Sequence, residues 1–419
     1  MWHVLQGSAD RVMIVTPLVL LVTLFALAAL LALASRLHLV DYPSGRKAHA
    51  APTPVVGGLA IVIGAAPFAL LLLPLTTQLK GFFIAAAILV GSGVVDDICG
   101  MRWQFRVVAQ LASALALVCL GGVQIHHLGT VFGFPAHELG ALAVPLSLVA
   151  TVGIINAVNM IDGVDGLAGS VGVVSLGMLA GAAAYAGNGR LADGLVILIG
   201  ALCAFLLLNL RTPWNPRAQL FLGNAGSEFL GLVVACACFR LTQNEHHPVG
   251  PQIAPFLIAP PLIDCLTLIV CRLRRRQSPF VGDRSHIHHL LLDAGFSATG
   301  VVAVIAGGTL AIGAGAALAL KAHAPAPAFT LVFVGLLVGH FLWTRHRERA
   351  VAGLAALRRW RPIPAPAPSV LEASPVELLP ERPPRWPWTY RPELAWAEEG
   401  DGPFLADHPH RIRDSHLQL

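Results

Sequence analysis

The sequence predicts an all-α polytopic membrane protein with about eleven transmembrane helices, and two observations support this fold class. The chain has 419 residues, of which 56% are hydrophobic and 12% charged, whereas a typical soluble domain is about 25% charged. Its apolar residues gather in stretches close to the roughly 20 residues that a helix needs to cross a bilayer. The expected spans are residues 13–35, 57–75, 79–95, 107–123, 139–158, 168–186, 192–210, 226–242, 252–271, 299–320 and 327–343.

The distribution of basic residues predicts how these helices are oriented. Lys and Arg concentrate in the cytoplasmic loops of membrane proteins, and alternate loops of this chain differ clearly in their content of both. The richer set includes Arg36, Lys47, Arg102, Arg211 and the arginines from 272 to 284, whereas the poorer set holds Arg11, Lys80, Arg190, Arg240 and Lys321. We therefore expect the N-terminus outside and the C-terminus in the cytoplasm. The net charge of +5 then reflects topology and does not favour a nucleic-acid partner.

The chain changes character after residue 343, which predicts three segments. Residues 1–343 form the membrane domain. Residues 344–360 have basic ends and an apolar middle, a pattern that predicts a helix on an anionic membrane surface. Residues 361–419 are rich in Pro and acidic residues, and we expect them to form a disordered cytoplasmic tail.

The carboxylates of the membrane domain gather on the side that is predicted to be cytoplasmic. Ionisable groups near a membrane are unfavourable unless they are paired or hydrated, so their clustering favours a shared site. Solvated charges that only mark helix ends would scatter over both sides. The clustered residues are Asp41, Asp96, Asp97, Asp162, Asp165 and Asp283.

The segment "GVVDDICG" (93–100) places Asp96 and Asp97 where the third span meets the cytoplasm. Adjacent side chains on a helix point about 100° apart, so the two carboxylates seldom share one ligand. One of them can face a metal or phosphate while the other orients a basic residue or acts as a base.

A more specific signal is "NAVNMIDGVDGLAG" (156–169). Asn156, Asn159 and Asp162 recur every three residues, which aligns them along one helical face. The glycines that follow allow the backbone to approach a ligand closely. Amide and carboxylate oxygens of this kind suit a uridine, a ribose or a hydrated Mg²⁺.

The longest predicted cytoplasmic loop, "RRRQSPFVGDRSHIHHLLLDAGFS" (274–297), combines arginines with His286, His288 and His289. Arg and protonated His are natural partners of a diphosphate. Because Mg²⁺ phosphate chemistry rarely uses His as a ligand, we interpret the histidines as phosphate or sugar recognition, with a Zn²⁺ site as the alternative.

Five motifs in this order resemble one family. They are "DYPSGRKAHAAPTPVVGGLA" (41–60), "VVDDICG", "NAVNMIDGVDGLAG", "FLGNAGSEFLG" (221–231) and "DRSHIHHLLLDAGFS". The chain resembles the polyprenyl-phosphate N-acetylhexosamine-1-phosphate transferases of bacterial membranes, from residue 13 to about 343. It is similar to the WecA-like branch of the MraY/WecA superfamily, because it lacks the "HHHFE" run of the branch that handles UDP-MurNAc-pentapeptide.

The resemblance implies a reaction and its partners. Such an enzyme transfers an N-acetylhexosamine-1-phosphate, most often GlcNAc-1-phosphate, from a UDP-sugar to undecaprenyl phosphate and releases UMP. It uses Mg²⁺, with Mn²⁺ as an alternative. It acts at the cytoplasmic face of the inner membrane, starts cell-surface polysaccharides such as O-antigen, and can form a homodimer.

The resemblance also assigns residue roles. Asp96 and Asp97 match the catalytic pair, one of which orients or deprotonates the lipid phosphate. Asn159, Asp162 and Asn224 match positions on the metal side. The residues that match substrate-binding positions are Lys47, Asp165, Asp283, Arg284, His286, His288 and His289.

Asn224 departs from the family, which usually has Asp at this position as a Mg²⁺ ligand. Asn keeps an oxygen for the metal but loses a full charge, so the affinity for Mg²⁺ should fall. Three interpretations stay open. The site is active with a high Mg²⁺ requirement, or Glu228 supplies the missing charge, or the chain is an inactive homologue in which Asn224 only caps a helix.

Two other classes of function compete with an enzyme. A transporter of nucleotide-sugars or lipid carriers would place polar groups near the bilayer midplane, for which Asp264 is the candidate. A membrane scaffold built on an inactive transferase fold would rest on Asn224 and on the C-terminal tail. The clustering of carboxylates on one side favours the enzyme.

Overall fold

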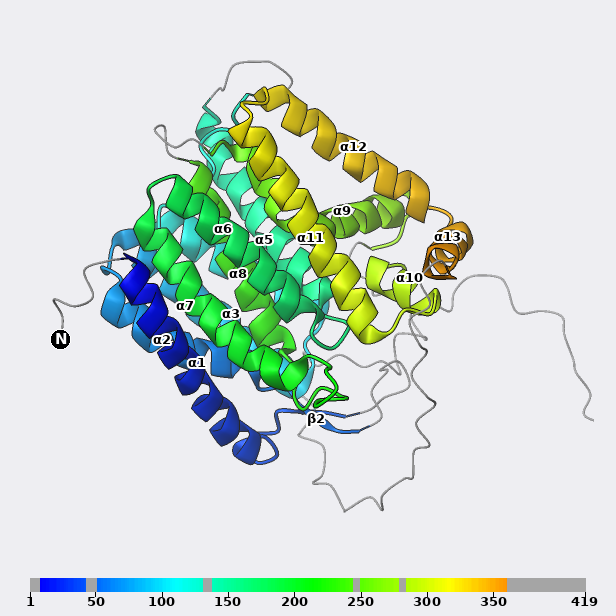
Figure 1. The fold of residues 1–419 in the computed structure, drawn as a ribbon. Coiled ribbons are helices and arrows are strands. Elements are labelled where there is room, and N and C mark those ends of the chain that lie inside the picture. Colours follow the sequence, from blue (N-terminus) through cyan, green and yellow to red (C-terminus); the bar gives the residue numbers. More distant parts are fainter. Residues whose placement is uncertain (1–7, 43–50, 131–137, 244–248, 279–283, 360–419) are drawn as a thin grey trace, which may run out of the picture.

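The computed structural model describes residues 8–42, 51–130, 138–243, 249–278 and 284–359. Within these ranges thirteen α-helices form a bundle (Figure 1). They are α1 (Ser8–Leu33), α2 (Gly57–Leu72), α3 (Thr77–Cys99), α4 (Trp103–Leu115), α5 (Ala143–Ile161), α6 (Leu167–Tyr185), α7 (Gly189–Asn209), α8 (Gly223–Thr242), α9 (Ala259–Arg274), α10 (Ile287–Asp293), α11 (Ala298–Lys321), α12 (Ala326–Thr344) and α13 (Arg347–Arg359). A π-helical turn extends α4, and 3₁₀ turns precede α5 and α9.

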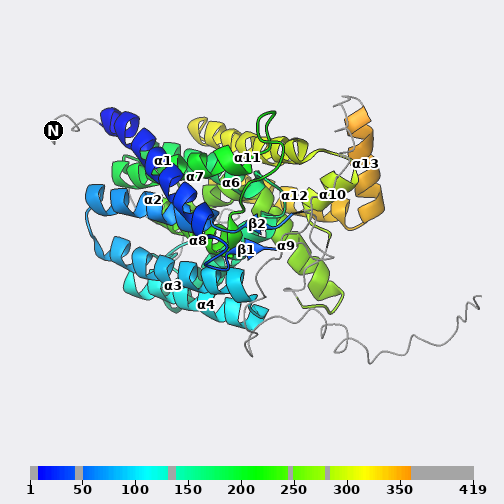
Figure 2. The same cartoon turned by 90° about the horizontal axis from the view of Figure 1, so that it is seen from below.

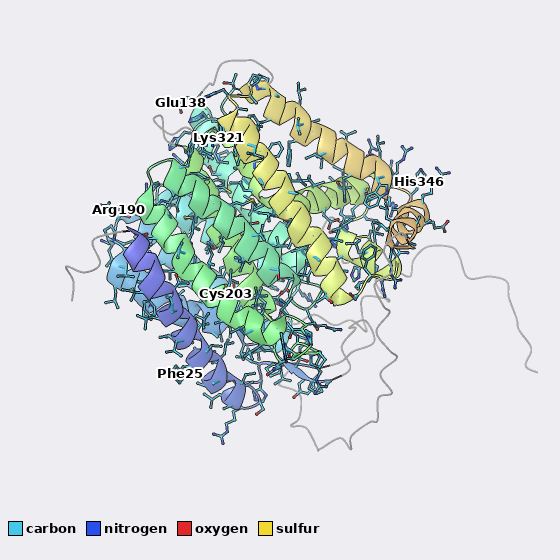
Figure 3. The ribbon with its side chains drawn as sticks, viewed as in Figure 1. Phe25, Glu138, Arg190, Cys203, Lys321 and His346 are labelled. Carbon is cyan, nitrogen blue, oxygen red and sulfur yellow. The ribbon has the colours of Figure 1, made fainter. Side chains whose placement is uncertain are left out.

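The helices confirm the predicted fold class. In the described part of the chain, 10 helices are long and apolar enough to cross a membrane. Each of the eleven predicted spans coincides with a helix. The predicted span that is not among these 10 is α2, an apolar helix of 16 residues. Outer helices carry large apolar side chains that point away from the bundle, as Phe25 of α1 does in Figure 3. Such a surface suits contact with lipid, while the orientation of the termini stays a prediction.

Helix α8 lies inside the bundle and begins with the glycine-rich turn. It contacts α2, α3, α5 and α6, and nearly every residue from 225 to 242 is buried. A helix that is apolar on all sides is typical of such a position. Gly58 of α2 and Gly226 of α8 lie so close that a Cβ on either would collide with the backbone of the other. The start of α8 is therefore fixed by close backbone packing.

A short hairpin brings the first predicted cytoplasmic loop to the start of α8. Strand β1 (Val40–Asp41) pairs antiparallel with β2 (Thr53–Pro54). The N–H of Phe221 donates to the carbonyl of Pro54 at 2.7 Å, and the N–H of Gly58 donates to the carbonyl of Leu222 at 2.9 Å. Two motifs that are far apart in the sequence therefore meet at one end of the bundle, which Figure 2 views from below.

The segment after the membrane domain contains α13, which packs on the rest of the protein. Ala350 is fully buried and Leu354 is nearly so, and α13 contacts both α10 and α12. These apolar side chains therefore face other helices, and contact between the helix and a membrane surface stays a prediction. The predicted tail at 361–419 lies outside the described residues.

Candidate active site

Four helix ends meet at the end of the bundle that carries the predicted motifs. Helices α3 and α5 end there, whereas α4 and α8 begin there. Side chains from these four ends bond to side chains or backbone amides of the others, for example across sequence separations of 53 and 128 residues. The fold thus brings Asp96, Asp97, Asn159 and Asn224 into one bonded region, which contains two of the six carboxylates that the sequence predicted to share a site.

The centre of this region is Arg106 of α4. Its Nη2 donates to Oδ1 of Asn159 at 2.9 Å, and its Nε lies 3.3 Å from Oδ2 of Asp96. The same Nη2 is 3.8 Å from Oε1 of Glu228. The Arg106 side chain is 29% exposed, whereas the side chains of Asp96 and Glu228 are 6% and 4% exposed. We call these four residues the Arg106 cluster.

Arg106 is the main residue that sequence reasoning missed. Arg106 lies outside the five quoted motifs, so no local pattern assigns it a role in the site. Its partners lie on three other helices, so only the packing of α4 reveals its position. Because it balances two buried carboxylates and keeps an open side, its guanidinium can also bind an anion such as a phosphate.

Asp96 and Asp97 point to different neighbours, as their adjacency on a helix predicts. Asp96 accepts the N–H of Met101 at 2.5 Å and pairs with Arg106. Asp97 accepts the N–H groups of Asn224 and Ala225 at 2.8 and 3.2 Å. Both amides belong to the first turn of α8, where N–H groups lack partners within the helix. The Asp97 carboxylate therefore anchors the start of α8.

This anchoring explains one glycine of the turn. Gly223 has a φ of +75°, a backbone conformation that side chains disfavour. A Cβ at this position would also lie 2.6 Å from Oδ2 of Asp97. Gly223 is thus required both by its backbone and by the approach of the carboxylate.

Asn224 does not cap α8. Its Oδ1 accepts a hydrogen bond from Nδ2 of Asn159 at 3.1 Å, while the first-turn amides of the helix are bound by Asp97. The interpretation of Asn224 as a helix cap is therefore wrong, and the physical reason is that Asp97 already occupies that role. The Asn224 side chain instead faces the Arg106 cluster through Asn159.

Glu228 lies one turn further along α8 in a buried polar network. Nε2 of Gln110 donates to Oε1 of Glu228 at 2.7 Å, and Nδ2 of Asn156 donates to Oε1 of Gln110 at 2.7 Å. Glu228 thus adds a carboxylate next to the site, but Arg106 already opposes its charge and Gln110 already donates a hydrogen bond to it. Asn156 and Asn159 both bond to α4, which shows that they share one face of α5.

The loop between α5 and α6 holds Asp162 and Asp165 in different ways. Nε of Arg211 lies 2.7 Å from Oδ2 of Asp165, which joins this loop to the segment after α7. Asp162 is half-buried, and its side chain makes no hydrogen bond or ion pair with the described residues. Burial, followed by the charge of Asp165, raises the pKa of Asp162 to about 7. A cation beside Asp162 would offset this unfavourable electrostatic energy.

The donor chemistry of this region fits Mg²⁺ in part. Mg²⁺ takes oxygen ligands from one or two side chains together with water and substrate phosphates. Asp162 offers a carboxylate, and Asn224 offers an amide oxygen that accepts one hydrogen bond. Both polar atoms of the Asn159 amide already have partners. Its oxygen accepts from Arg106, and its nitrogen donates to Asn224 and Ser227. In the described residues, no three His, Cys, Asp or Glu side chains are grouped as a metal site.

One of the predicted histidines, His288, lies next to the Asp162 loop. His288 is 2% exposed, and a Cβ on Gly163 would lie 2.5 Å from its Nε2. Burial, followed by the charges of His289 and His286, lowers the pKa of His288 to about 3. A low pKa favours the neutral form of His288 at pH 7, and its predicted role in phosphate or sugar recognition stays a prediction. It can still pack against a ligand or share a hydrogen bond with it.

Asp264 has a role that the transporter interpretation did not anticipate. Its Oδ2 is 2.8 Å from Nδ1 of His286, and its Oδ1 accepts the N–H of Ile287 at 3.0 Å. The side chain is 3% exposed. Asp264 therefore orients His286 and binds the first amide of α10, so it is engaged in joining α9 to α10.

The remaining predicted residues are placed less fully. Arg284 is exposed, and its Nη2 lies 3.4 Å from Oδ1 of Asp293 at the end of α10. His288 and His289 have ring centroids 4.3 Å apart. Lys47 and Asp283 lie outside the described residues.

Comparisons with known proteins agree on one family. The model described as glycosyl transferase family 4 matches residues 79–242. The undecaprenyl-phosphate alpha-N-acetylglucosaminyl 1-phosphate transferase of Haemophilus influenzae is 33% identical over 266 residues, which cover 64% of this chain and 75% of that protein. The proteins of the same name from Yersinia pestis and Escherichia coli K12 are each 32% identical, and the match covers 63% of this chain and 72% of each relative.

Proposed function

This chain belongs to glycosyl transferase family 4, together with the undecaprenyl-phosphate N-acetylglucosaminyl 1-phosphate transferases, and from that premise we propose its reaction. It transfers GlcNAc-1-phosphate from UDP-GlcNAc to undecaprenyl phosphate and releases UMP. The sugar and the lipid follow from the names of the relatives, and the UDP donor follows from the resemblance of the motifs.

The observation that carries the proposal is the Arg106 cluster. A reaction between two phosphate-bearing substrates needs cationic groups that are held in place where the phosphates meet. Arg106 is fixed by bonds to Asp96, Asn159 and Glu228, and 29% of its side chain stays exposed. A preorganised donor of this kind stabilises developing charge without having to reorganise during the reaction.

The reaction balances without an added oxidant or base. An oxygen of the undecaprenyl phosphate forms a bond to the β-phosphorus of the donor. The bond from that phosphorus to the bridging oxygen breaks, and UMP leaves with the electron pair. The lipid phosphate is largely ionised at pH 7 because its second pKa is about 6. Proton removal by a carboxylate therefore adds little.

Each carboxylate of the pair then has a positioning role. Asp96 holds the guanidinium of Arg106 through its Oδ2, and it is itself oriented by the N–H of Met101. Asp97 fixes the first turn of α8, which carries Asn224. We propose that Asp96 sets the direction from which Arg106 contacts the lipid phosphate, and that Asp97 sets the distance between α3 and α8.

We propose Mg²⁺ as the cofactor, with Asp162 and Asn224 as the side chains that would hold it. When bound, the ion neutralises the diphosphate of the donor. The carboxylate of Asp162 carries most of the affinity, since Asn224 contributes an oxygen without a charge. The enzyme should therefore need more Mg²⁺ than a relative with Asp at this position, and Mn²⁺ should serve as well or better.

We also propose the cytoplasmic face of a bacterial inner membrane as the place of reaction. The support is the excess of basic residues in the loops at this end, which include Arg106 and Arg211. A nucleotide-sugar donor is available only in the cytoplasm. The lipid-linked product is the first intermediate of a cell-surface polysaccharide such as O-antigen.

UMP release tests the proposal. The detergent-purified chain is incubated with undecaprenyl phosphate, Mg²⁺ or Mn²⁺, and the UDP-linked forms of GlcNAc, GalNAc, QuiNAc and FucNAc. We expect release with UDP-GlcNAc that requires the lipid and that falls at least about 100-fold in Asp96→Asn. Release with another donor would change the proposed donor sugar but keep the proposed class of reaction.

The contradicting result is no release with any donor, either by the wild type or by Asn224→Asp. Uptake of an intact nucleotide-sugar into proteoliposomes would then favour the transporter. Release by Asn224→Asp alone would identify this chain as an inactive homologue with a disabled metal site.

A further inference from the structure

Helix α10 cannot hold its own position, although it carries two of the predicted substrate-binding histidines. It has 7 residues, and isolated helices shorter than about 12 residues are unstable in water. Its place must therefore come from what it contacts. At its start, Asp264 of α9 binds the N–H of Ile287 and the ring of His286.

The other end of α10 is held by α13. Nη2 of Arg347 forms an ion pair with Oδ2 of Asp293, the last residue of α10, and Arg284 pairs with the other oxygen of the same carboxylate. Ala350 of α13 is 0% exposed and Leu354 is 8% exposed. Both views of the bundle place α13 directly beside α10 (Figures 1 and 2).

The inner side of α10 reaches the metal side of the site. His288 lies against Gly163, the residue after Asp162, and Leu290 and Leu291 are 1% exposed. Contacts therefore run without a break from α13 through α10 to the loop of Asp162. Neither α10 nor α13 falls within residues 79–242, the part that the family model matches.

We propose that α13 is a clamp that positions α10, so that Arg347 and Ala350 act as positioning residues for binding of the nucleotide-sugar. This inference rests on the proposed function for the identity of the donor. A small displacement of α10 moves His288 away from the Asp162 loop, and misplacement by about 1 Å can lower activity about 100-fold. The clamp acts on the donor and leaves the lipid acceptor unaffected.

The test uses two matched substitutions in the full-length chain. Ala350→Asp places a charge in the contact between α13 and the bundle. Ala352→Asp makes the same change two residues later, on the exposed side of the helix. For Ala350→Asp we expect the KM for UDP-GlcNAc to rise about tenfold, with the KM for undecaprenyl phosphate within about twofold of wild type. Ala352→Asp should match the wild type in both.

A second pair of variants tests the ion pair. Arg347→Glu should raise the KM for the donor about fivefold, because it repels Asp293, and the conservative Arg347→Lys should restore it to within about twofold. Arg349→Glu is the control, since Arg349 is exposed and forms no ion pair with the described residues. Each variant is also assayed for thermal unfolding.

The outcomes separate a clamp from a role in stability alone. A destabilised enzyme has fewer active molecules, so kcat falls and both KM values stay unchanged. That pattern in Ala350→Asp and Arg347→Glu, or equal effects in Ala352→Asp and Arg349→Glu, would overturn the inference. If the wild type released no UMP, the proposed function would fail on its own. Calorimetry of UDP-GlcNAc binding to the same four variants would then test whether α13 positions α10 for the donor.

Discussion

The two halves of the candidate site differ in how firmly their side chains are held. In the Arg106 cluster, every polar side chain has partners on other helices, and Asp96 and Glu228 are almost fully buried. On the other side, the Asp162 side chain makes no hydrogen bond or ion pair with the described residues, and His288 is held mainly by packing. The first half is preorganised, whereas the second half depends on what binds it.

Because of this difference, the two halves suit different steps, namely phosphoryl transfer and substrate binding. A rigid network suits the stabilisation of charge at the reacting phosphates, which demands fixed donors. A region with an open carboxylate suits the binding of a cation and a nucleotide, which supply the missing partners. Variants in the Arg106 cluster should therefore lower kcat, and variants around Asp162 and α10 should change the requirement for metal and donor.

The largest effect is expected from Arg106→Gln. It removes the cationic centre and leaves Asp96 and Glu228 without a counter-charge, so kcat should fall about 1,000-fold. Arg102→Gln serves as the control, because Arg102 is exposed and lies just before α4. Steady-state UMP release measures both. Equal losses in the two variants would show that Arg106 matters only as a basic residue of the loop.

A smaller effect is expected from Asp97→Asn. Asn keeps one acceptor for the first turn of α8 but loses the charge that two amides share. We expect kcat to fall about 100-fold and the start of α8 to become more mobile. Hydrogen exchange at residues 223–227 would report that mobility. An active variant with unchanged exchange would show that Asp97 does not anchor the helix.

The metal requirement should depend on pH through Asp162. Its raised pKa of about 7 means that the carboxylate is largely protonated at pH 6 and ionised at pH 8. Mg²⁺ binds only the ionised form, so the Mg²⁺ concentration for half-maximal activity should rise about tenfold as the pH falls across this range. The relevant assay is a Mg²⁺ titration at each pH, with Asp162→Asn as the control that removes the dependence. A flat profile in the wild type would exclude Asp162 as a ligand.

The smallest effect is expected from Asn224→Asp. The added charge should lower the Mg²⁺ concentration for half-maximal activity by about threefold to tenfold, while kcat changes little. Oδ1 at this position accepts from Asn159 in either case, so the geometry of the turn should be kept. Mg²⁺ titrations of the wild type and the variant measure the shift. Unchanged activity and metal dependence would show that residue 224 is not a metal ligand.

Local sequence rules predicted the parts of the site that are set within one helix. The long apolar stretches predicted the helices, and the adjacency of Asp96 and Asp97 predicted their divergence. The spacing of Asn156, Asn159 and Asp162 predicted one helical face, which holds for the two asparagines, whereas Asp162 lies just beyond the end of α5. Each of these follows from the geometry of a single helix.

The contacts between helices could not be derived in the same way. The pairing of Arg106 with residues on α3, α5 and α8 depends on how four helices pack. Its sequence position makes Asp264 a candidate for a group near the membrane midplane, whereas its contact with His286 depends on how α10 packs against α9. Likewise, the apolar residues of α13 gave no indication that they face α10 and α12.

The central claim is that the Arg106 cluster acts as one unit, and a double-mutant cycle tests it most directly. UMP release is measured for Arg106→Gln, Glu228→Gln and the variant with both changes. Residues that act as a unit are strongly non-additive, so we predict that the double variant is no slower than Arg106→Gln by more than about twofold. If the two losses multiplied instead, Arg106 and Glu228 would act independently and the claim of one network would be contradicted.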